Sequence, residues 1–433
     1  MYEGKTRSLF VKYAIPQMIG MLFNSVYIIV DGIFVGNRLG REAMAAAAIA
    51  VPLVEILIAL SMAIASGAGI LISGQLARKE QEKAVQTFNT AVLCAVSIGI
   101  AIIVLGNIFL HPIADALGAT PQIHDDALRY LRYIVTFSPF LLLSFLLGGL
   151  ARNDGRPKLA MFALAFGSVS NIVLDYVFMY PLNMGIGGAA LATAIGPLFS
   201  VLILLPHFLM KRGSLHFAKV KIHFAQIRRI FTLGFPSFIM EFTIGIVTFV
   251  YNFAIVRNGY GEIGLAAYLV IGYLMLIILT LFLGMAEGLQ PVFSYFAGTG
   301  AQERCREMRR FAAKVFLSVG ILCYVLIVLF SRHFYAVFNP GDTELIEFMT
   351  GKSIPYFCGF FLAGYNILMI SYWQSLQHTK QALLVSLSRS ILWPAALTIL
   401  LPLIFGSEAI WLCLSLSEGI TACMAFVLLT RKK

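Results

Sequence analysis

Charged residues are scarce in this chain of 433 residues, of which Lys, Arg, Asp and Glu make up only 12%. Ordinary soluble domains carry roughly 25% charge, whereas 59% of this sequence is hydrophobic. A water-soluble protein with this composition could not cover its own surface. The excess apolar surface must face lipid, so the composition excludes a soluble globular protein and predicts an integral membrane protein.

Motifs for metal binding, disulfide bonding and catalysis are also missing. The six cysteines form no CxxC pair, and no His joins them at metal-ligand spacing. We interpret them as small core residues, because free Cys is among the most buried residue types. The seven His are scattered, with no HExxH motif. We therefore expect neither an enzyme nor a bound cofactor.

Twelve long apolar runs are what the sequence does have. A helix needs about 20 mainly apolar residues to cross the hydrocarbon core, and these runs are too long and too uniformly apolar for barrel strands. The sequence predicts an all-α membrane protein with twelve transmembrane helices. The runs lie near 11–36, 49–76, 84–110, 129–151, 159–180, 186–211, 229–256, 263–292, 311–332, 350–377, 381–402 and 406–430.

The distribution of Lys and Arg predicts the orientation. With the N-terminus in the cytoplasm, 24 basic residues fall on the cytoplasmic side and seven on the outer side. Arg152, Arg156 and Lys158 form one of the cytoplasmic clusters. This asymmetry follows the positive-inside rule and predicts a multi-pass protein of the cell membrane with both termini in the cytoplasm. Attraction of the basic loops to the anionic inner leaflet accounts for the net charge of +11 without nucleic acid.

An internal repeat is visible when the sequence is shifted by about 221 residues. Pro16 in the first run then meets Pro236 in the seventh, and Ser73 meets Ser294. Identity is low, and the support comes from an offset that stays nearly constant over three runs and their loops. The repeat predicts two pseudo-symmetric six-helix bundles.

The longest basic loop separates the two halves. We expect an N-terminal lobe at 1–211, a cytoplasmic linker at 212–228 and a C-terminal lobe at 229–433. Both halves have six spans and so start on the same side, which places the pseudo-symmetry axis along the membrane normal. Two lobes around a central cleft can rock between inward-open and outward-open states, so the sequence favours a transporter over a channel.

Carboxylates lie within the predicted spans, where an ionisable side chain is costly and calls for a functional explanation. This number of buried acids is unusual for a channel or a passive scaffold. The six residues are Asp31, Glu55, Asp175, Glu241, Glu287 and Glu418.

Helical spacing groups polar side chains around two of these acids. Asn24 and Tyr27 share a helix face with Asp31, and Asn171 shares one with Asp175. If the first and fifth spans face each other, the two carboxylates meet, with Thr193 of the sixth span following nearby. Two such carboxylates in a low dielectric cannot easily both stay ionised.

A pair of this kind can hold a proton or bind a monovalent cation, the latter through Asp31, Asp175 and Asn171. The alternative interpretation is a fixed hydrogen-bond cluster that holds two helices together.

Two further acids are candidates for contact with a cationic substrate. Glu241 follows Pro236 in the seventh span, and Glu287 stands in the eighth, with Gln290 three residues further on. The alternative is that each acid lies near a helix end or pairs locally. Arg389 lies within the eleventh span and could act as an internal counter-ion for one of the acids.

Several local motifs resemble those of multidrug and toxic compound extrusion (MATE) transporters, and the likeness covers essentially the whole chain. The motifs are Pro16 with Val30–Gly36 in the first span, Asn171–Asp175 in the fifth, Gly288–Pro291 with Ser294–Tyr295 in the eighth, and Asn339–Asp342, which echoes Leu117–Thr120.

The resemblance implies secondary antiport, in which a proton or sodium ion enters as a drug-like, often cationic compound leaves. It also implies that Asp31, Asn171, Asp175 and Thr193 form a coupling site in the N-terminal lobe, with Tyr27 as a neighbour. Bending of the first helix near Pro16 is a mechanism proposed for the family. The expected partners are drug-like small molecules and the lipid bilayer, and we expect a monomer.

The chain departs from one branch of the family, in which an acid in the tenth span completes a cation site with the acid of the seventh. Here the stretch 353–377 contains no Asp or Glu, so a sodium site in the C-terminal lobe is not expected. A flippase or exporter for a lipid-linked or other endogenous precursor is the alternative function. It would favour a basic interior, whereas the interior charges here are mainly acidic.

Overall fold

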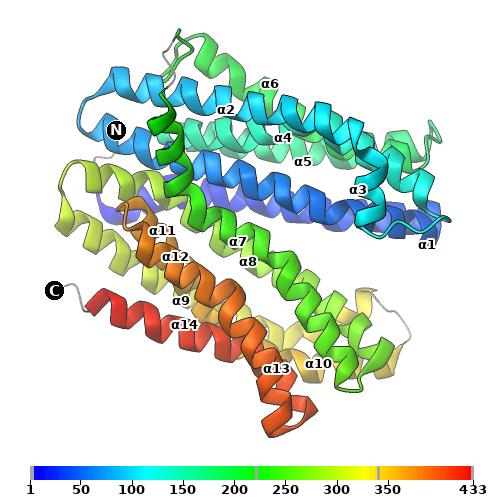
Figure 1. The fold of residues 1–433 in the computed structure, drawn as a ribbon. Helices are drawn as coiled ribbons and strands as arrows, with labels where there is room; N and C mark the ends of the chain where they lie inside the picture. Colours follow the sequence, from blue (N-terminus) through cyan, green and yellow to red (C-terminus); the bar gives the residue numbers. More distant parts are fainter. Residues whose placement is uncertain (1–3, 220–222, 339–341, 431–433) are drawn as a thin grey trace.

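The computed structural model describes residues 4–219, 223–338 and 342–430, and these residues fold almost entirely into helices (Figure 1). Among them, eleven helices are long and apolar enough to cross a membrane, and one bent helix pair supplies a twelfth span. The prediction of an all-α protein with twelve spans is thereby confirmed. The Asn339–Gly341 part of the motif noted above lies outside the described residues.

The first two spans form one long element, α1 (Thr6–Ala77), interrupted at Gly40, whose φ of 83° is not helical. The following elements are α2 (Gln81–Ile108), the short α3 (Leu110–Ala116), α4 (His124–Asn153), α5 (Pro157–Met179), α6 (Ile186–Leu209), α7 (Phe224–Arg257), α8 (Gly261–Gly298) and α9 (Gln302–Phe338). The last three spans comprise α10 (Thr343–Phe357) with α11 (Phe361–Ser375), α12 (Thr379–Leu387) with α13 (Trp393–Phe405), and α14 (Cys413–Thr430).

The tenth span is broken between α10 and α11 by a bend of 45°, which the apolar run does not reveal. The break occurs where α14 approaches closely. The backbone N–H of Gly359 donates to Ser415 Oγ at 2.8 Å, and Ser415 Oγ donates to the carbonyl of Tyr356 at 2.7 Å. A side chain from another span thus satisfies backbone groups that a continuous helix would have paired internally.

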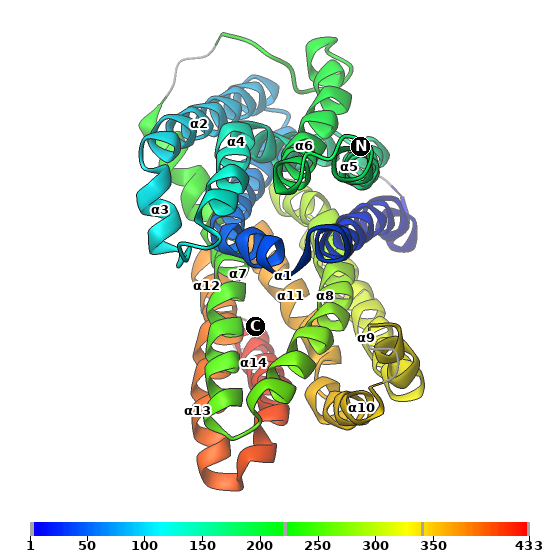
Figure 2. The ribbon, with the colours of Figure 1, turned by 90° about the vertical axis from the view of Figure 1, so that its right-hand side faces the viewer.

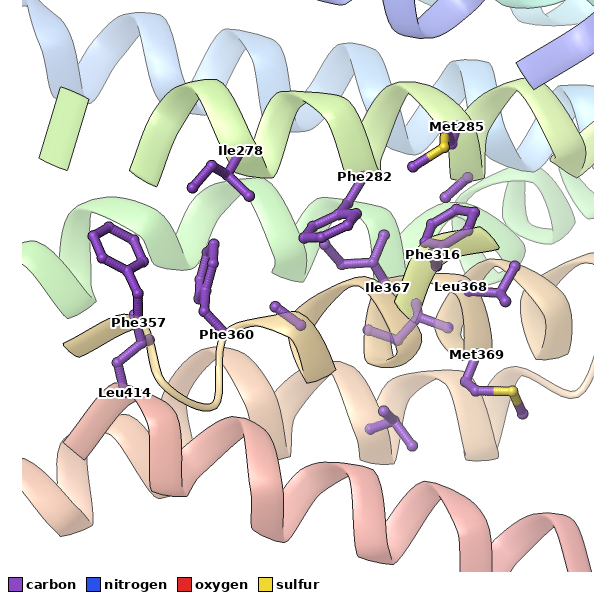
Figure 3. Packing of buried hydrophobic residues seen from close by; sticks show 14 of the residues in the cluster. Ile278, Phe282, Met285, Phe316, Phe357, Phe360, Ile367, Leu368, Met369 and Leu414 are labelled. Carbon is purple, nitrogen blue, oxygen red and sulfur yellow. The ribbon is translucent and has the colours of Figure 1, made fainter. Parts of the chain in front are cut away.

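Buried apolar side chains form two separate clusters. One draws mainly on the elements up to α6, and the other mainly on α7 to α14. Figure 3 shows part of the second cluster, where Phe282 of α8 and Phe316 of α9 stack beside Ile367 of α11. The two groups of helices approach each other on the side where the described ends of the chain lie and diverge toward the other side (Figures 1 and 2). We call the side on which the two groups approach each other the terminal side.

Two helices cross between the groups on the terminal side. The beginning of α1, including Leu9 and Tyr13, packs in the second cluster, whereas Val35 further along the same span belongs to the first cluster. Conversely, Ile230 and Leu233 at the beginning of α7 belong to the first cluster. Pro16 lies within this crossing segment, since Ile15 and Met18 on either side of it both pack against the second cluster. Because of this exchange, the exact lobe boundaries at 1–211 and 229–433 remain a prediction.

The described part of the predicted linker at 212–228 is attached to the first half. Leu215 is completely buried in the first cluster. The backbone N–H of Ser214 donates to Asp154 Oδ1 at 2.8 Å, and that of Ala218 donates to Asn89 Oδ1 at 3.1 Å. The seventh span begins earlier than its apolar run at 229–256, since α7 starts at Phe224.

Candidate functional site

Asp31 of α1 and Asp175 of α5 lie together in the first helix group. Their side chains are close enough for a hydrogen bond once one of them carries a proton. Asp175 is completely buried. Close packing of α1 against α5 places the two acidic helix faces opposite each other.

Four oxygen atoms in this cluster have no hydrogen-bond partner among the described residues. They are Asp31 Oδ1, both carboxylate oxygens of Asp175, and Asn171 Oδ1. None of the ion pairs found in the described part of the chain involves either Asp. Buried polar atoms are normally paired, and unpaired oxygens grouped in this way can accept a proton or coordinate a hard cation.

A pocket lies beside this cluster within the first helix group. Asn24, Tyr27, Asn171 and Thr193 all contribute to its wall. Asn171 Nδ2 lies 3.5 Å from Thr193 Oγ1. The rest of the wall is mainly apolar, with residues such as Phe137, Leu141, Phe145, Leu164 and Pro197. Its polar edge and apolar body suit a small amphipathic molecule.

Tyr130 of α4 is a member of the cluster that the sequence analysis missed. It is buried, its hydroxyl forms a hydrogen bond with Thr193, and it interacts electrostatically with Asp31 and Asp175. In the sequence Tyr130 stands between Arg129 and Arg132, at the beginning of an apolar run. A position of this kind is typical of a loop boundary. Tyr130 is four residues from Ile134, which lines the pocket, so the two side chains share a face of α4. This spacing could have pointed to Tyr130.

A second pocket lies between the two helix groups. It brings together the three residues predicted to contact substrate, Glu241 of α7 with Glu287 and Gln290 of α8. Gln290 Nε2 donates to Ser66 Oγ of α1 at 2.7 Å. Glu241 forms no ion pair among the described residues, although it interacts electrostatically with the like-charged Glu55 and Glu287 and, more weakly, with Arg389.

Glu287, in contrast, already has a basic partner. Arg152 of α4 places Nη2 at 3.3 Å from Glu287 Oε2, and Gln17 Nε2 donates to the same oxygen at 2.9 Å. The sequence analysis assigns Arg152 to a cytoplasmic loop, whereas the structure places it in the last turn of α4 with its side chain only 11% exposed. The helix continues beyond the apolar run and carries the guanidinium into the pocket wall.

Arg389 fulfils its predicted role as an internal counter-ion. Its Nε lies 3.0 Å from Glu418 Oε1 of α14, and Asn366 Nδ2 of α11 donates to Glu418 Oε2 at 2.8 Å. The guanidinium comes from a π-helical turn, Ser388–Leu392, between α12 and α13. Such turns are rare and occur frequently at functional sites. Glu418 is therefore neutralised within the second helix group.

Two helix bundles that close on one side, diverge on the other and hold pockets lined by both polar and apolar side chains define a membrane transporter. Comparison with known proteins gives the family. The MatE family model matches residues 16–177 and 236–400, well over half of the chain. The chain therefore belongs to the MatE family. The two matched stretches begin at Pro16 and Pro236, as the internal repeat predicts.

Relatives and solved structures of this family match nearly the full chain. The multidrug export protein MepA of Staphylococcus aureus (strain MRSA252) is 24% identical over 422 residues, which cover 96% of this chain and 92% of MepA. MepA of Staphylococcus saprophyticus is also 24% identical and covers 99% and 95%.

Among solved structures, a MATE protein in the straight conformation superposes with a TM-score of 0.93 at 20% identity, covering 99% and 96% of the two chains. An outward-facing multidrug resistance MATE transporter gives 0.92 at 21%, covering 98% and 95%. A transporter from Pyrococcus furiosus, described by a reversed polarity of its binding pocket, gives 0.91 at 21%, covering 99% and 96%.

Proposed function

We propose that this protein is a secondary active antiporter of the cell membrane that exports drug-like, cationic amphipathic compounds in exchange for protons or sodium ions. The observation that carries the proposal is the Asp31–Asp175 pair, whose buried oxygens have no basic partner among the described residues. The export of multiple drugs named for the MepA relatives supports the class of cargo.

Coupling between ion and cargo follows from linkage. A proton or sodium ion at Asp31 and Asp175 favours one arrangement of the bundles, and the compound favours the other. Each ligand shifts the equilibrium only by its difference in affinity for the two states. The membrane potential adds about 2.3 kcal/mol per charge per 100 mV, so cation entry can drive export. Asn171, Thr193 and Tyr27 orient the coupling site in this proposal.

Cargo binding is proposed for the pocket between the bundles, where Glu241 offers a carboxyl group that has no ion-pair partner among the described residues. Pro16 is proposed to allow α1 to bend, because it lies inside α1 in the segment that packs against the second cluster, shortly before Gly20 packs on α5. We also propose that the terminal side faces the cytoplasm and that the protein acts as a monomer.

The alternative cargo is a lipid-linked or other endogenous precursor. A reversed polarity of the binding pocket is described for the Pyrococcus furiosus transporter. The charge of the pocket is therefore the feature that distinguishes a protein for cationic compounds from one for an anionic precursor. An anionic precursor would require a cation left without a partner in the central pocket. Arg152 is the basic residue of that pocket and is paired with Glu287, which favours cationic cargo.

The test is transport by Asp31→Asn and Asp175→Asn variants in everted vesicles, with pH and sodium gradients imposed separately. Both variants are expected to lose drug-dependent ion flux. Asp115→Asn is the matched control, because Asp115 is an exposed residue of α3 that pairs with His124. Ion flux that survives in both variants would remove the coupling assignment.

A further inference from the structure

One ion pair joins the two helix groups. Among the salt bridges of the described residues, only Arg152 of α4 with Glu287 of α8 connects the first group to the second. The others lie within one group or between neighbouring turns. The two partners are 135 positions apart in the sequence, so their contact depends entirely on how the bundles are placed.

The pair also separates two pockets. Arg152 and Glu287 line the pocket between the bundles. They also line a smaller pocket, whose other lining residues belong mainly to the first helix group. The smaller pocket shares Ser144 and Ser200 with the pocket beside the coupling site. The pair is therefore at the junction between cargo pocket and coupling pocket, with 11% and 19% of its side chains exposed.

Within this junction Glu287 is paired by groups of the protein itself. Arg152 Nε has no hydrogen-bond partner among the described residues, so Glu287 is the principal acceptor for this guanidinium. On the carboxylate side, Gln17 of α1 is the additional donor. Glu241 lines the same pocket. The junction thus contains two acids and one cation that comes from the opposite bundle.

Separation of the bundles on the terminal side must break this pair. In the present conformation they are in backbone contact there, since a Cβ added to Gly298 of α8 would lie 2.9 Å from the carbonyl oxygen of Gly74 of α1. If the bundles part, Arg152 moves with α4 and Glu287 with α8. The carboxylate then loses its cation and faces the opened cleft beside Glu241.

We propose that Arg152 is an internal competitor for cationic cargo at Glu287, an inference that rests on the cationic cargo of the proposed function. When the terminal side is open, a cationic compound replaces the guanidinium at Glu287. When the bundles close there, Arg152 returns and displaces the compound toward the other side. The difference in cargo affinity between the two states, which transport requires, then comes from exchanging one cation for another at a single carboxylate.

The experiment measures equilibrium binding of tetraphenylphosphonium, a permanent cation, to the purified full-length protein without ion gradients. Arg152→Gln is expected to bind it about tenfold more tightly than the parent, a typical size for coupling between two ligands. Glu287→Gln should bind it more weakly, and the double variant should resemble Glu287→Gln, because the gain requires the carboxylate. Triphenylphosphine oxide, the neutral analogue, should bind alike to parent and Arg152→Gln.

Controls separate charge from folding. Arg228→Gln removes an exposed arginine of α7 and should leave binding unchanged, while thermal unfolding checks that each variant is folded. Arg152→Lys keeps the positive charge and should stay close to the parent. Unchanged or weaker cation binding in folded Arg152→Gln would overturn the inference while the proposed function stands. A parent protein that does not bind the cation would remove the cationic cargo and the inference together.

Discussion

Gly288 of α8 packs directly on the backbone of Tyr13 of α1, so closely that a Cβ at Gly288 would lie 2.4 Å from the Tyr13 carbonyl oxygen. Real Cβ atoms essentially never approach that closely, and the atom in the way is backbone. Gly67 meets the carbonyl of Ile230 in the same manner. Glycines at these crossings allow the beginning of α1 to pack on α8, and the beginning of α7 to pack on α1, by backbone contact, as small residues do at helix interfaces in membranes.

Gly288→Ala is expected to push the beginning of α1 away from α8, because overpacking costs about 1–3 kcal/mol. Export of ethidium from cells that express the variant should fall by about tenfold. Gly272→Ala in the same helix is the matched control, since nothing lies within 4 Å of a Cβ at that position. Equal export by the two variants would show that this backbone contact does not limit transport.

Glu241→Gln is expected to weaken binding of cationic cargo by about tenfold, equivalent to about 1.4 kcal/mol. The reason is that Glu241 is the acid of the central pocket without an ion-pair partner among the described residues. Binding of a neutral compound of similar shape should change little. Titration of purified protein with both compounds measures the effect. Glu303→Gln, which alters an exposed acid of α9, serves as the control, and an identical loss there would dismiss Glu241 as a specific contact.

Tyr130→Phe is expected to reduce drug-dependent ion flux by about two- to tenfold. The substitution keeps the ring and removes only the hydroxyl that bonds to Thr193, and a neutral hydrogen bond contributes about 0.5–1.5 kcal/mol. Tyr133→Phe, one helical turn further on, should retain parental flux. The assay is ion movement in proteoliposomes loaded with drug. Tyr130 has no part in the coupling site if its variant matches Tyr133→Phe.

Glu418→Gln and Arg389→Gln are each expected to destabilise the second bundle, because removing one partner of a buried ion pair costs about 3–5 kcal/mol. The double variant should recover part of that loss, since it leaves no uncompensated charge. Thermal unfolding in detergent provides the comparison. Single variants as stable as the parent would mean that Asn366, which donates to Glu418, holds the cluster without the guanidinium.

Local patterns predicted the parts of the site that depend on one helix. Asp31, Tyr27 and Asn24 share a face because helical spacing requires it, and the same holds for Asn171 with Asp175. The sequence argument took the meeting of the first and fifth spans as a condition, and the packing of α1 against α5 fulfils it. Tyr130 escaped prediction because its place near the end of a run made it look like a loop residue.

Other features escaped because hydropathy contains no signal for them. The break in the tenth span depends on Ser415 of another helix, which satisfies the backbone at Tyr356 and Gly359. Arg152 was expected in a cytoplasmic loop, and only the extended α4 shows that it lies in the pocket wall. A charged residue just beyond an apolar run has the same local sequence whether it faces water or another helix.

The sequence by itself determined that this chain is a twelve-span helical membrane protein with acids in its interior, because apolar length and scarce charge leave no other stable arrangement in lipid. Only the tertiary structure decided how each acid is compensated. Glu418 is paired with Arg389 and Glu287 with Arg152, whereas Asp31 and Asp175 face each other. The physical reason is that a charge can be neutralised only by groups within a few ångströms, and which distant helices come that close is set by the packing of the whole chain.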